Sequence, residues 1–324
     1  MSFVDDYLLY IETVRRYSPR TVSIYAEILE EYFSFYEDIT PPQEALEAGL
    51  IRSYQVHLLD ERRECARTVN LHLSVLSGLC RYLLKNHIIA ANPVSLVKRP
   101  RLQKRLPQVY RDESLETYFK NTEHCASVDS LELLQAEGVT EFGTRLYEER
   151  LRRLIILLLS GTGIRRSELI SLKYSSVDFG RRRIKVIGKG DKMREIPLVD
   201  SLCEELLLYL EARRVMIGES EPAEGPLLVT AKGSALYPVY VDRAVKKELG
   251  TISGITGRKS PHVLRHTLAT QLLDNGTPLN SIKELLGHSS LAATQVYTHN
   301  SISKLRNVYN NAHPRAKNGG KNGD

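Results

Sequence analysis

SPHVLRHTLATQLLDNGTPLNSIKELLGHSSLAATQVYTH, residues 260–299, is the stretch that decides the fold we expect. Leucines at helical spacing predict a first helix with one apolar face: Leu264, Leu268, Leu272 and Leu273. Asn275-Gly276 ends that helix, and Thr277-Pro278 caps and opens a second one over residues 279–286. Gly287 ends the second helix, and residues 290–297 are expected to form a short third one.

These helices carry polar side chains that suit one kind of chemistry. His262 and Arg265 begin the first helix, His288 follows the second, and Tyr297 lies nine residues after His288. Short helices joined by tight turns can bring such groups to one cleft. Arginine binds phosphate through two donors, and a tyrosine hydroxyl can act as an oxygen nucleophile. The cluster therefore favours phosphate chemistry.

Length and composition are those of an ordinary globular protein with room for two domains. The chain has 324 residues, of which 42% are hydrophobic and 26% charged. The sequence shows neither an apolar run of about 18 residues nor a secretory signal. Four scattered cysteines predict a reduced, cytoplasmic protein without disulfides or a zinc site: Cys65, Cys80, Cys125 and Cys203.

Positive charge is concentrated in two parts of the chain. Residues 98–105 carry five bases and no acid, and residues 151–324 carry 27 bases against 16 acids. Residues 1–97 and 106–150 have balances of −4 and −6. A polyanion such as DNA is the expected partner of the two basic parts.

Hydrophobic patterning divides the chain into segments of different kinds. Residues 1–90 predict four or five amphipathic helices, and residues 91–107 have the prolines and bases of a linker. A strong helix is expected from Glu148 to Gly161. Residues 183–197 contain two runs rich in β-branched residues around a glycine turn, which predicts a β-hairpin or part of a three-stranded sheet. Further helices are expected over residues 201–216 and 240–249, with a short strand at 227–230.

Four motifs in order carry a resemblance to a known family. They are GTGIRRSEL from Gly161, VIGKGDKMREIPL from Val186, HVLRHTLAT from His262 and LLGHSSLAATQVYTH from Leu285. Together they resemble the tyrosine recombinases of the integrase family. The tail VYNNAHPRAK, from Val308, resembles the XerC-type proteins of the Xer branch.

The resemblance implies a mainly α fold with a small antiparallel β-sheet, arranged as a C-shaped clamp around DNA. Its first two implied parts are a helical, SAM-like core-binding domain over residues 1–90 and a basic linker over residues 91–107. A mixed α/β catalytic domain follows over residues 108–299, with an acidic insertion at about 121–147. Residues 300–324 form a tail that is expected to contact a neighbouring protomer.

The resemblance also implies a role for each site residue. Tyr297 is the expected nucleophile, and Lys189 protonates the leaving oxygen. Arginines and histidines bind the phosphate or assist proton transfer: Arg165, Arg265, His262 and His288. Glu168 is the expected acidic partner of Arg165. Further DNA contacts are expected from Arg20, Arg67, Asn70, Lys192 and Arg194, and Arg166 remains a candidate for one more.

The implied function is site-specific DNA recombination through a 3′-phosphotyrosyl intermediate, in Xer-type resolution of chromosome dimers. The expected partners are a double-stranded recombination site and further recombinase subunits, either copies of this chain or a XerD-like protein, as a tetramer on two sites. A DNA translocase is a further candidate partner. No cofactor, metal or membrane is expected, and the location is cytoplasmic and nucleoid-associated.

Three other functions stay open at this point. An integrase or invertase of a mobile element would use the same chemistry. A DNA-binding regulator of the same fold would bind DNA without forming a covalent complex. A metal-dependent nuclease could use His262 and His266, which are four residues apart, but the sequence lacks the matching carboxylate cluster. In the favoured interpretation His266 is a packed or capping side chain.

Overall fold

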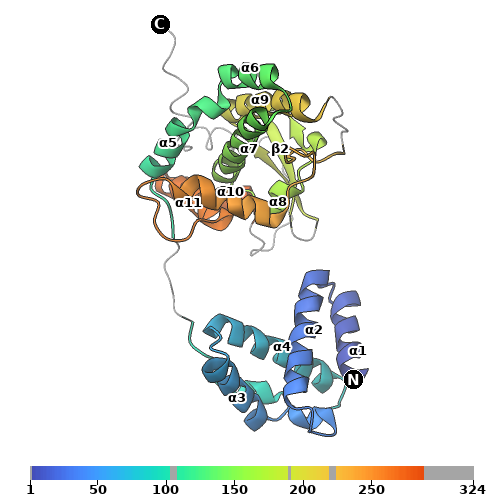
Figure 1. The fold of residues 1–324 in the computed structure, drawn as a ribbon. Coiled ribbons are helices and arrows are strands. Elements are labelled where there is room, and N and C mark those ends of the chain that lie inside the picture. Colours follow the sequence, from blue (N-terminus) through green and yellow to red (C-terminus); the bar gives the residue numbers. More distant parts are fainter. Residues whose placement is uncertain (1, 103–107, 189–190, 219–223, 288–324) are drawn as a thin grey trace. The chain divides into compact units, whose positions relative to one another are not determined.

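The computed structural model describes residues 2–102, 108–188, 191–218 and 224–287. Its internal contacts divide the chain into two compact units, Met1–Arg105 and Leu106–Asp324 (Figure 1). The boundary falls inside the segment that the sequence predicts as a linker. Each unit has its own hydrophobic core.

The first unit is a bundle of four α-helices, within the predicted four or five. They are α1 (Ser2–Thr13), α2 (Pro19–Phe35), α3 (Ala48–Val56) and α4 (Ala66–Lys85). Pro19 starts α2, and the Ser18 hydroxyl accepts a hydrogen bond from the Thr21 amide at 3.3 Å, which is a normal N-cap. Three short turns complete the unit: η1 (Pro42–Ala45), the π-helical η2 (His57–Glu61) and η3 (Pro93–Leu96).

The start of the predicted linker belongs to the first unit. Val94 and Val97 are buried in its core. The Gln55 side chain donates to the Lys98 carbonyl at 3.1 Å, and the Asn70 amide donates to the Pro100 carbonyl at 2.9 Å. The chain is therefore held against α4 as far as Pro100.

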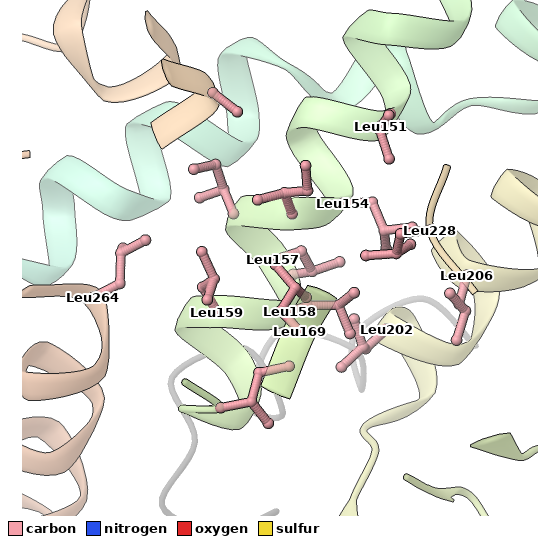
Figure 2. Packing of buried hydrophobic residues seen from close by; sticks show 14 of the residues in the cluster. Leu151, Leu154, Leu157, Leu158, Leu159, Leu169, Leu202, Leu206, Leu228 and Leu264 are labelled. Atoms are coloured by element: carbon pink, nitrogen blue, oxygen red, sulfur yellow. The ribbon is translucent and has the colours of Figure 1, made fainter. Parts of the chain in front are cut away.

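The second unit is built around α7 (Glu141–Thr162), a helix buried along most of its length. Helices on several sides cover it: α6 (Val128–Glu137), α9 (Asp200–Ile217), α10 (Pro238–Gly250) and α11 (Pro261–Asp274). Figure 2 shows leucines of α7 packed against leucines of these neighbours, among them Leu202 and Leu206 of α9 and Leu264 of α11. The centre of α7 is apolar on every face, because partners surround it.

A small antiparallel sheet of three strands lies in the same unit, as the sequence predicts. It consists of β1 (Val177–Asp178), β2 (Arg183–Ile187) and β3 (Met193–Pro197), in that order. Ile184 pairs with Ile196 and Val186 with Arg194, and these four side chains are all buried. The strand expected at 227–230 does not form, because Val229 makes only an isolated bridge with Ala235.

The region expected to be an acidic insertion is folded into the second unit. It contains η4 (Glu123–Ala126) and α6, preceded by α5 (Asp112–Asn121). Leu131 and Leu134 of α6 are buried in the core. Arg150 and Arg153 of α7 donate to the carbonyls of Ser127 at 2.9 Å and Phe119 at 2.7 Å. Since α7 already begins at Glu141, the predicted start at Glu148 was too late.

Two helices end the described chain, α11 and α12 (Leu279–Leu286), with α8 (Arg166–Ile170) earlier in the same unit. The predicted bounds of α12 are confirmed, but two details of the prediction are wrong. Leu273 is 51% exposed and so lies off the apolar face, and the buried Thr277 hydroxyl has no hydrogen-bond partner among the residues that the structure describes and does not cap α12. The expected third helix lies outside the described residues. Within the described chain, no helix is long and apolar enough to cross a membrane.

Truncating a leucine at the centre of α7 should test this packing. Leu158 is completely buried, so Leu158→Ala should lower the free energy of unfolding by about 2–5 kcal/mol. Leu207→Ala on α9, where the side chain is 49% exposed, is the matched control and should change it by less than about 1 kcal/mol. Urea unfolding followed by far-ultraviolet circular dichroism measures both, and equal losses would contradict the packing described.

Candidate active site

Arg165 is positioned by the end of α7. Gly163 ends that helix in the left-handed conformation, with a φ of 62°, and Arg165 is the N-cap residue of α8. A Cβ atom at Gly163 would lie 2.6 Å from Leu286 Cδ2 and 3.0 Å from Leu268 Cδ2. Both the backbone angle and the lack of space therefore require glycine here.

Glu168 joins Arg165 to Arg194. The Arg165 Nη1 group donates to Glu168 Oε1 at 2.7 Å, and the Arg165 amide donates to Oε2 at 2.7 Å. Arg194, on β3, donates from Nη1 to Oε1 at 2.9 Å and from Nη2 to Oε2 at 2.8 Å. The Glu168 and Arg194 side chains are only 3% and 6% exposed. The predicted pairing of Glu168 with Arg165 is thus present, and a second, more deeply buried arginine shares the carboxylate.

Arg265 comes to the same place from α11. Its guanidinium is buried and donates from Nη1 to the Gly163 carbonyl at 2.5 Å and from Nη2 to the Leu286 carbonyl. These bonds use two of the five N–H groups of the side chain, and the other three have no hydrogen-bond partner among the described residues. The turn that precedes Arg165 and the end of α12 together fix the orientation of Arg265.

Three successive carbonyl groups at the end of α12 each accept a hydrogen bond from a different arginine. Arg194 Nε donates to Leu285 at 2.8 Å, Arg265 Nη2 to Leu286, and Arg165 Nη2 to Gly287 at 2.7 Å. The last carbonyls of a helix lack partners within the helix and form the negative end of its dipole. We call Arg165, Arg194 and Arg265 the arginine cluster.

The arginine cluster carries an excess of positive charge. Burial alone would raise the pKa of Glu168, but the hydrogen bonds from Arg194 and Arg165 outweigh burial and lower that pKa to about 2. Burial and the cations of Arg165 and Arg194 lower the pKa of Arg265 to about 10. At neutral pH three arginine cations therefore surround one carboxylate, a sum of +3 and −1. A net charge of +2 in a partly buried site favours binding of an anion such as a phosphodiester.

His262 lies on the first turn of α11, three residues before Arg265, and its side chain is exposed. Partial burial and the nearby cation of Arg166 lower its pKa, which favours the neutral ring, the form that can accept a proton. His266 was expected to be a packed or capping side chain; it is exposed, so the packed alternative is wrong. Arg166 forms an ion pair with Asp242 of α10.

The β2–β3 hairpin begins beside Glu168. The Gly188 amide donates to the Lys192 carbonyl at 2.8 Å and closes the hairpin. A Cβ atom at Gly188 would lie 3.4 Å from Glu168 Oε1. Lys192 is exposed, as a DNA contact requires. Lys189, His288 and Tyr297 lie outside the described residues, so their predicted roles stay predictions.

The remaining predicted DNA contacts lie in the first unit. Arg20 and Arg67 are exposed in the first turns of α2 and α4. Asn70 is half-buried, and its amide is bonded to the Pro100 carbonyl. The structure thus gives Asn70 a local role in holding the chain against α4. The roles of all three at DNA remain predictions.

Arg194 is the site residue for which the structure departs furthest from the prediction. Its guanidinium is buried and bonded to Glu168 and Leu285, so it is not placed as the phosphate contact that the sequence suggested. Sequence reasoning also missed the carbonyls at the end of α12. The signal for them was Gly287, whose left-handed conformation, with a φ of 63°, ends the helix.

One further group of side chains has ligand types that metals use. Within the described residues, the ligand atoms of His124, Cys125 and Glu149 lie within 4.8 Å of one another. Burial and the Glu149 carboxylate raise the pKa of the Cys125 thiol, while a metal requires the thiolate. Arg153 and Arg150 add positive charge beside it. Without a bound metal the Cys125 thiol is therefore neutral at pH 7, and it packs as a buried side chain.

Comparison with known proteins gives the family. The sequence pattern of the Phage integrase family matches residues 141–304, and that of the Phage integrase N-terminal SAM-like domain matches residues 3–90. The protein named tyrosine recombinase XerC from Chlorobaculum parvum is 35% identical over 326 aligned positions, which cover 97% of this chain and 95% of that protein. This chain belongs to the tyrosine recombinases. It is thus a site-specific DNA recombinase of the XerC-like kind, as its motifs predicted.

Solved tyrosine recombinases share the fold. The XerH recombinase bound to its palindromic difH substrate is 19% identical, with a TM-score of 0.64 over 98% of this chain and 83% of that one. A lambda integrase tetramer bound to a Holliday junction is also 19% identical, with a TM-score of 0.61 over 91% of this chain and 80% of that one. The predicted fold class, mainly α with a small antiparallel sheet, is confirmed.

The fit of Gly163 against α12 can be tested with two glycines of similar conformation. Gly163→Ala should displace Leu286 and Leu268, whereas Gly276→Ala has no described atom within 4 Å of the new Cβ. Both positions have positive φ, so each substitution should have a backbone cost of about 1–3 kcal/mol. Only Gly163→Ala should add a clash and slow DNA cleavage. Thermal unfolding and a cleavage assay separate the two, and identical behaviour of the variants would refute the fit.

Proposed function

We propose that this recombinase cuts and rejoins DNA through Tyr297 and that two members of the arginine cluster, Arg165 and Arg265, bind the scissile phosphate. The observation that supports this is the net positive site formed by Arg165 and Arg265 around Glu168. Phosphodiester transfer needs cationic donors for the charge on the non-bridging oxygens, and two arginines with open N–H groups meet that need.

In the proposed reaction the Tyr297 oxygen attacks the scissile phosphorus and forms a 3′-phosphotyrosyl bond. The bond from phosphorus to the 5′-oxygen breaks, and Lys189 gives that oxygen a proton. Arg165 and Arg265 hold the non-bridging oxygens, with His288 as a further donor. His262, whose lowered pKa favours the neutral ring, accepts the tyrosine proton. A 5′-hydroxyl of the second strand later attacks the phosphotyrosine, so the bond energy is kept and no ATP is consumed.

The biological process that fits best is Xer-type resolution of chromosome dimers. Its support is the 35% identity with a XerC protein over nearly the whole chain. The proposed partners are a recombination site on duplex DNA and a XerD-like second recombinase, in a tetramer on two sites, with a DNA translocase as a further candidate and the nucleoid as the location. The lambda integrase tetramer on a Holliday junction shares the fold, which supports assembly on DNA.

Replacing the nucleophile should separate binding from chemistry. Tyr297→Phe should bind a recombination site normally but form no covalent complex, because phenylalanine has no hydroxyl to attack phosphorus. Tyr237→Phe, at a tyrosine that is 48% exposed on the same unit, is the control and should be trapped like the wild type. A nicked suicide substrate and a denaturing gel give the measurement.

Three results of that assay would contradict the proposal. Trapping of Tyr297→Phe at the wild-type rate would remove Tyr297 from the mechanism. Cleavage that disappears in EDTA, without a covalent complex in any variant, would favour a metal-dependent nuclease. Binding by the wild type with neither cleavage nor trapping would favour a DNA-binding regulator.

The segment after the nucleophile is proposed to dock on a neighbouring protomer. Ile302, Leu305, Val308 and Tyr309 recur at helical spacing, and so short an amphipathic helix needs a surface to bury its apolar face. Deletion of residues 301–324 should leave binding to one half-site intact, weaken cooperative binding to two, and abolish strand exchange. Gel-shift titrations on one and two half-sites test this. An equal loss on a single half-site would show that the tail completes its own subunit.

A further inference from the structure

Arg194 has a bonding pattern that differs from those of Arg165 and Arg265, the two proposed phosphate-binding arginines. Its side chain is 6% exposed, and three of its N–H groups are directed at protein acceptors. Both carboxylate oxygens of Glu168 accept from its two terminal nitrogens, while Nε donates to the Leu285 carbonyl. The planar fork of arginine fits this arrangement, and a lysine could not reproduce it.

The contacts of Arg194 join segments that are far apart in the sequence. Arg194 lies on β3, Glu168 on α8, and Leu285 in the last turn of α12. Gly287 adds a close approach, because a Cβ atom there would lie 3.1 Å from Arg194 Nη1. The residues that carry the chemistry in the proposed function stand next to these segments: Arg165 precedes α8, and His288 follows Gly287 in the sequence.

Arg194 also affects how Arg165 is bonded to the Glu168 carboxylate. Glu168 Oε1 accepts from Arg165 Nη1 and from Arg194 Nη1, so the two arginines share one oxygen. Arg165 then keeps its Nη2 group on the Gly287 carbonyl, and its side chain stays 30% exposed. Without Arg194, Glu168 Oε2 would keep only the Arg165 amide as a donor, so the carboxylate could accept both terminal nitrogens of the Arg165 guanidinium, which would turn it away from Gly287.

We propose that Arg194 is a positioning residue of this recombinase: by occupying both oxygens of Glu168 and the Leu285 carbonyl, it holds Arg165 in the orientation that receives the scissile phosphate. The inference rests on the proposed function. It adds a residue whose role is to orient the phosphate-binding group without touching the DNA.

The test compares two arginines of the same sheet that both form ion pairs. Arg194→Met removes the fork and keeps an unbranched side chain. Arg183→Met is the matched control, because Arg183 is 12% exposed and donates to Glu195 at 2.6 Å, in an ion pair away from Arg165. Arg194→Lys keeps the positive charge without the planar fork.

Single-turnover trapping on a suicide substrate gives the first measurement. Arg194→Met should form the covalent complex about 10²-fold more slowly, the size of loss expected from a misplaced catalytic group, with DNA affinity changed less than threefold. Arg183→Met should match the wild type in rate, and Arg194→Lys should stay slow. A normal rate for Arg194→Met, or full recovery in Arg194→Lys, would overturn the proposal. Failure of the wild type itself to form the complex would instead reject the proposed function.

The pH dependence of trapping distinguishes positioning from loss of structure. In the wild type the pKa of Glu168 is lowered to about 2, so the carboxylate is ionised throughout the usual assay range. Arg194→Met removes the main hydrogen bond and a cation that oppose the effect of burial, so the pKa of Glu168 should rise. Trapping by this variant should therefore fall on acidification at a pH where the wild type and Arg183→Met keep their rates. An unchanged acid limb would contradict the role.

A measurement without DNA keeps the inference testable whatever the activity. The Arg165 amide donates to Glu168 Oε2 at 2.7 Å, so it should be protected from hydrogen exchange. Exchange at this amide should be faster in Arg194→Met than in Arg183→Met. Equal protection in the two variants would show that Arg194 does not hold Glu168, and the proposal would fail.

Discussion

One buried carboxylate organises the active-site end of the second unit. Glu168 accepts four N–H groups, from the Arg165 amide, the Arg165 side chain and the fork of Arg194. Loss of one partner from such a buried pair typically destabilises a protein by about 3–5 kcal/mol, yet replacing the whole pair with apolar residues is often neutral. The pair therefore contributes a defined geometry more than net stability. That geometry ties the end of α7 to β3 and, through Leu285, to α12.

The arginine cluster also shows how a helix terminus can prepare a site for an anion. The C-terminal end of α12 is the negative end of its dipole, which by itself would repel phosphate. Its last carbonyls instead bind Arg194, Arg265 and Arg165 and hold their guanidiniums in place. Each arginine side chain has five N–H donors, so hydrogen bonds to carbonyl groups that use one or two of these donors leave other donors for a ligand. The orientation of the cations is thus established before a phosphate arrives.

Local patterns in the sequence predicted the elements well, because helices and hairpins depend on spacing and on glycine or proline at their ends. The bounds of α12 and the β2–β3 hairpin follow from Gly287 and from the glycine turn that begins at Gly188. Partners distant in the chain could not be predicted in this way. Nothing in the sequence around Arg194 shows that it is buried, because its acceptors lie 26 and 91 residues away.

Because contacts between distant parts of the chain could not be predicted, the structure also differs from the prediction at other residues. Leu273 has the right residue type for the core but the wrong position on the helix, and it is exposed. Val94 was read as part of a linker, although η3 packs it into the first core. The acidic composition of the region that was expected to be an insertion reflects only the residues on its surface. Leu131 and Leu134, which fix it to α7 and α9, are a minority of its residues.

The attachment of the chain to α4 as far as Pro100 limits how the two units can act. In the second unit the Gln108 side chain is bonded to the backbone of Thr256 and Arg258. Eight residue steps separate Pro100 from Gln108, and even fully extended they span at most about 29 Å. Once one unit is bound to DNA, this connection keeps the attachment point of the other unit within that maximum distance of the bound unit's attachment point. Binding of the other unit is then intramolecular, at an effective concentration in the millimolar range. Under the proposed function, in which both units contact DNA, weak contacts in each unit are enough for the whole chain to bind tightly, and lengthening this connection should weaken binding without changing any DNA contact.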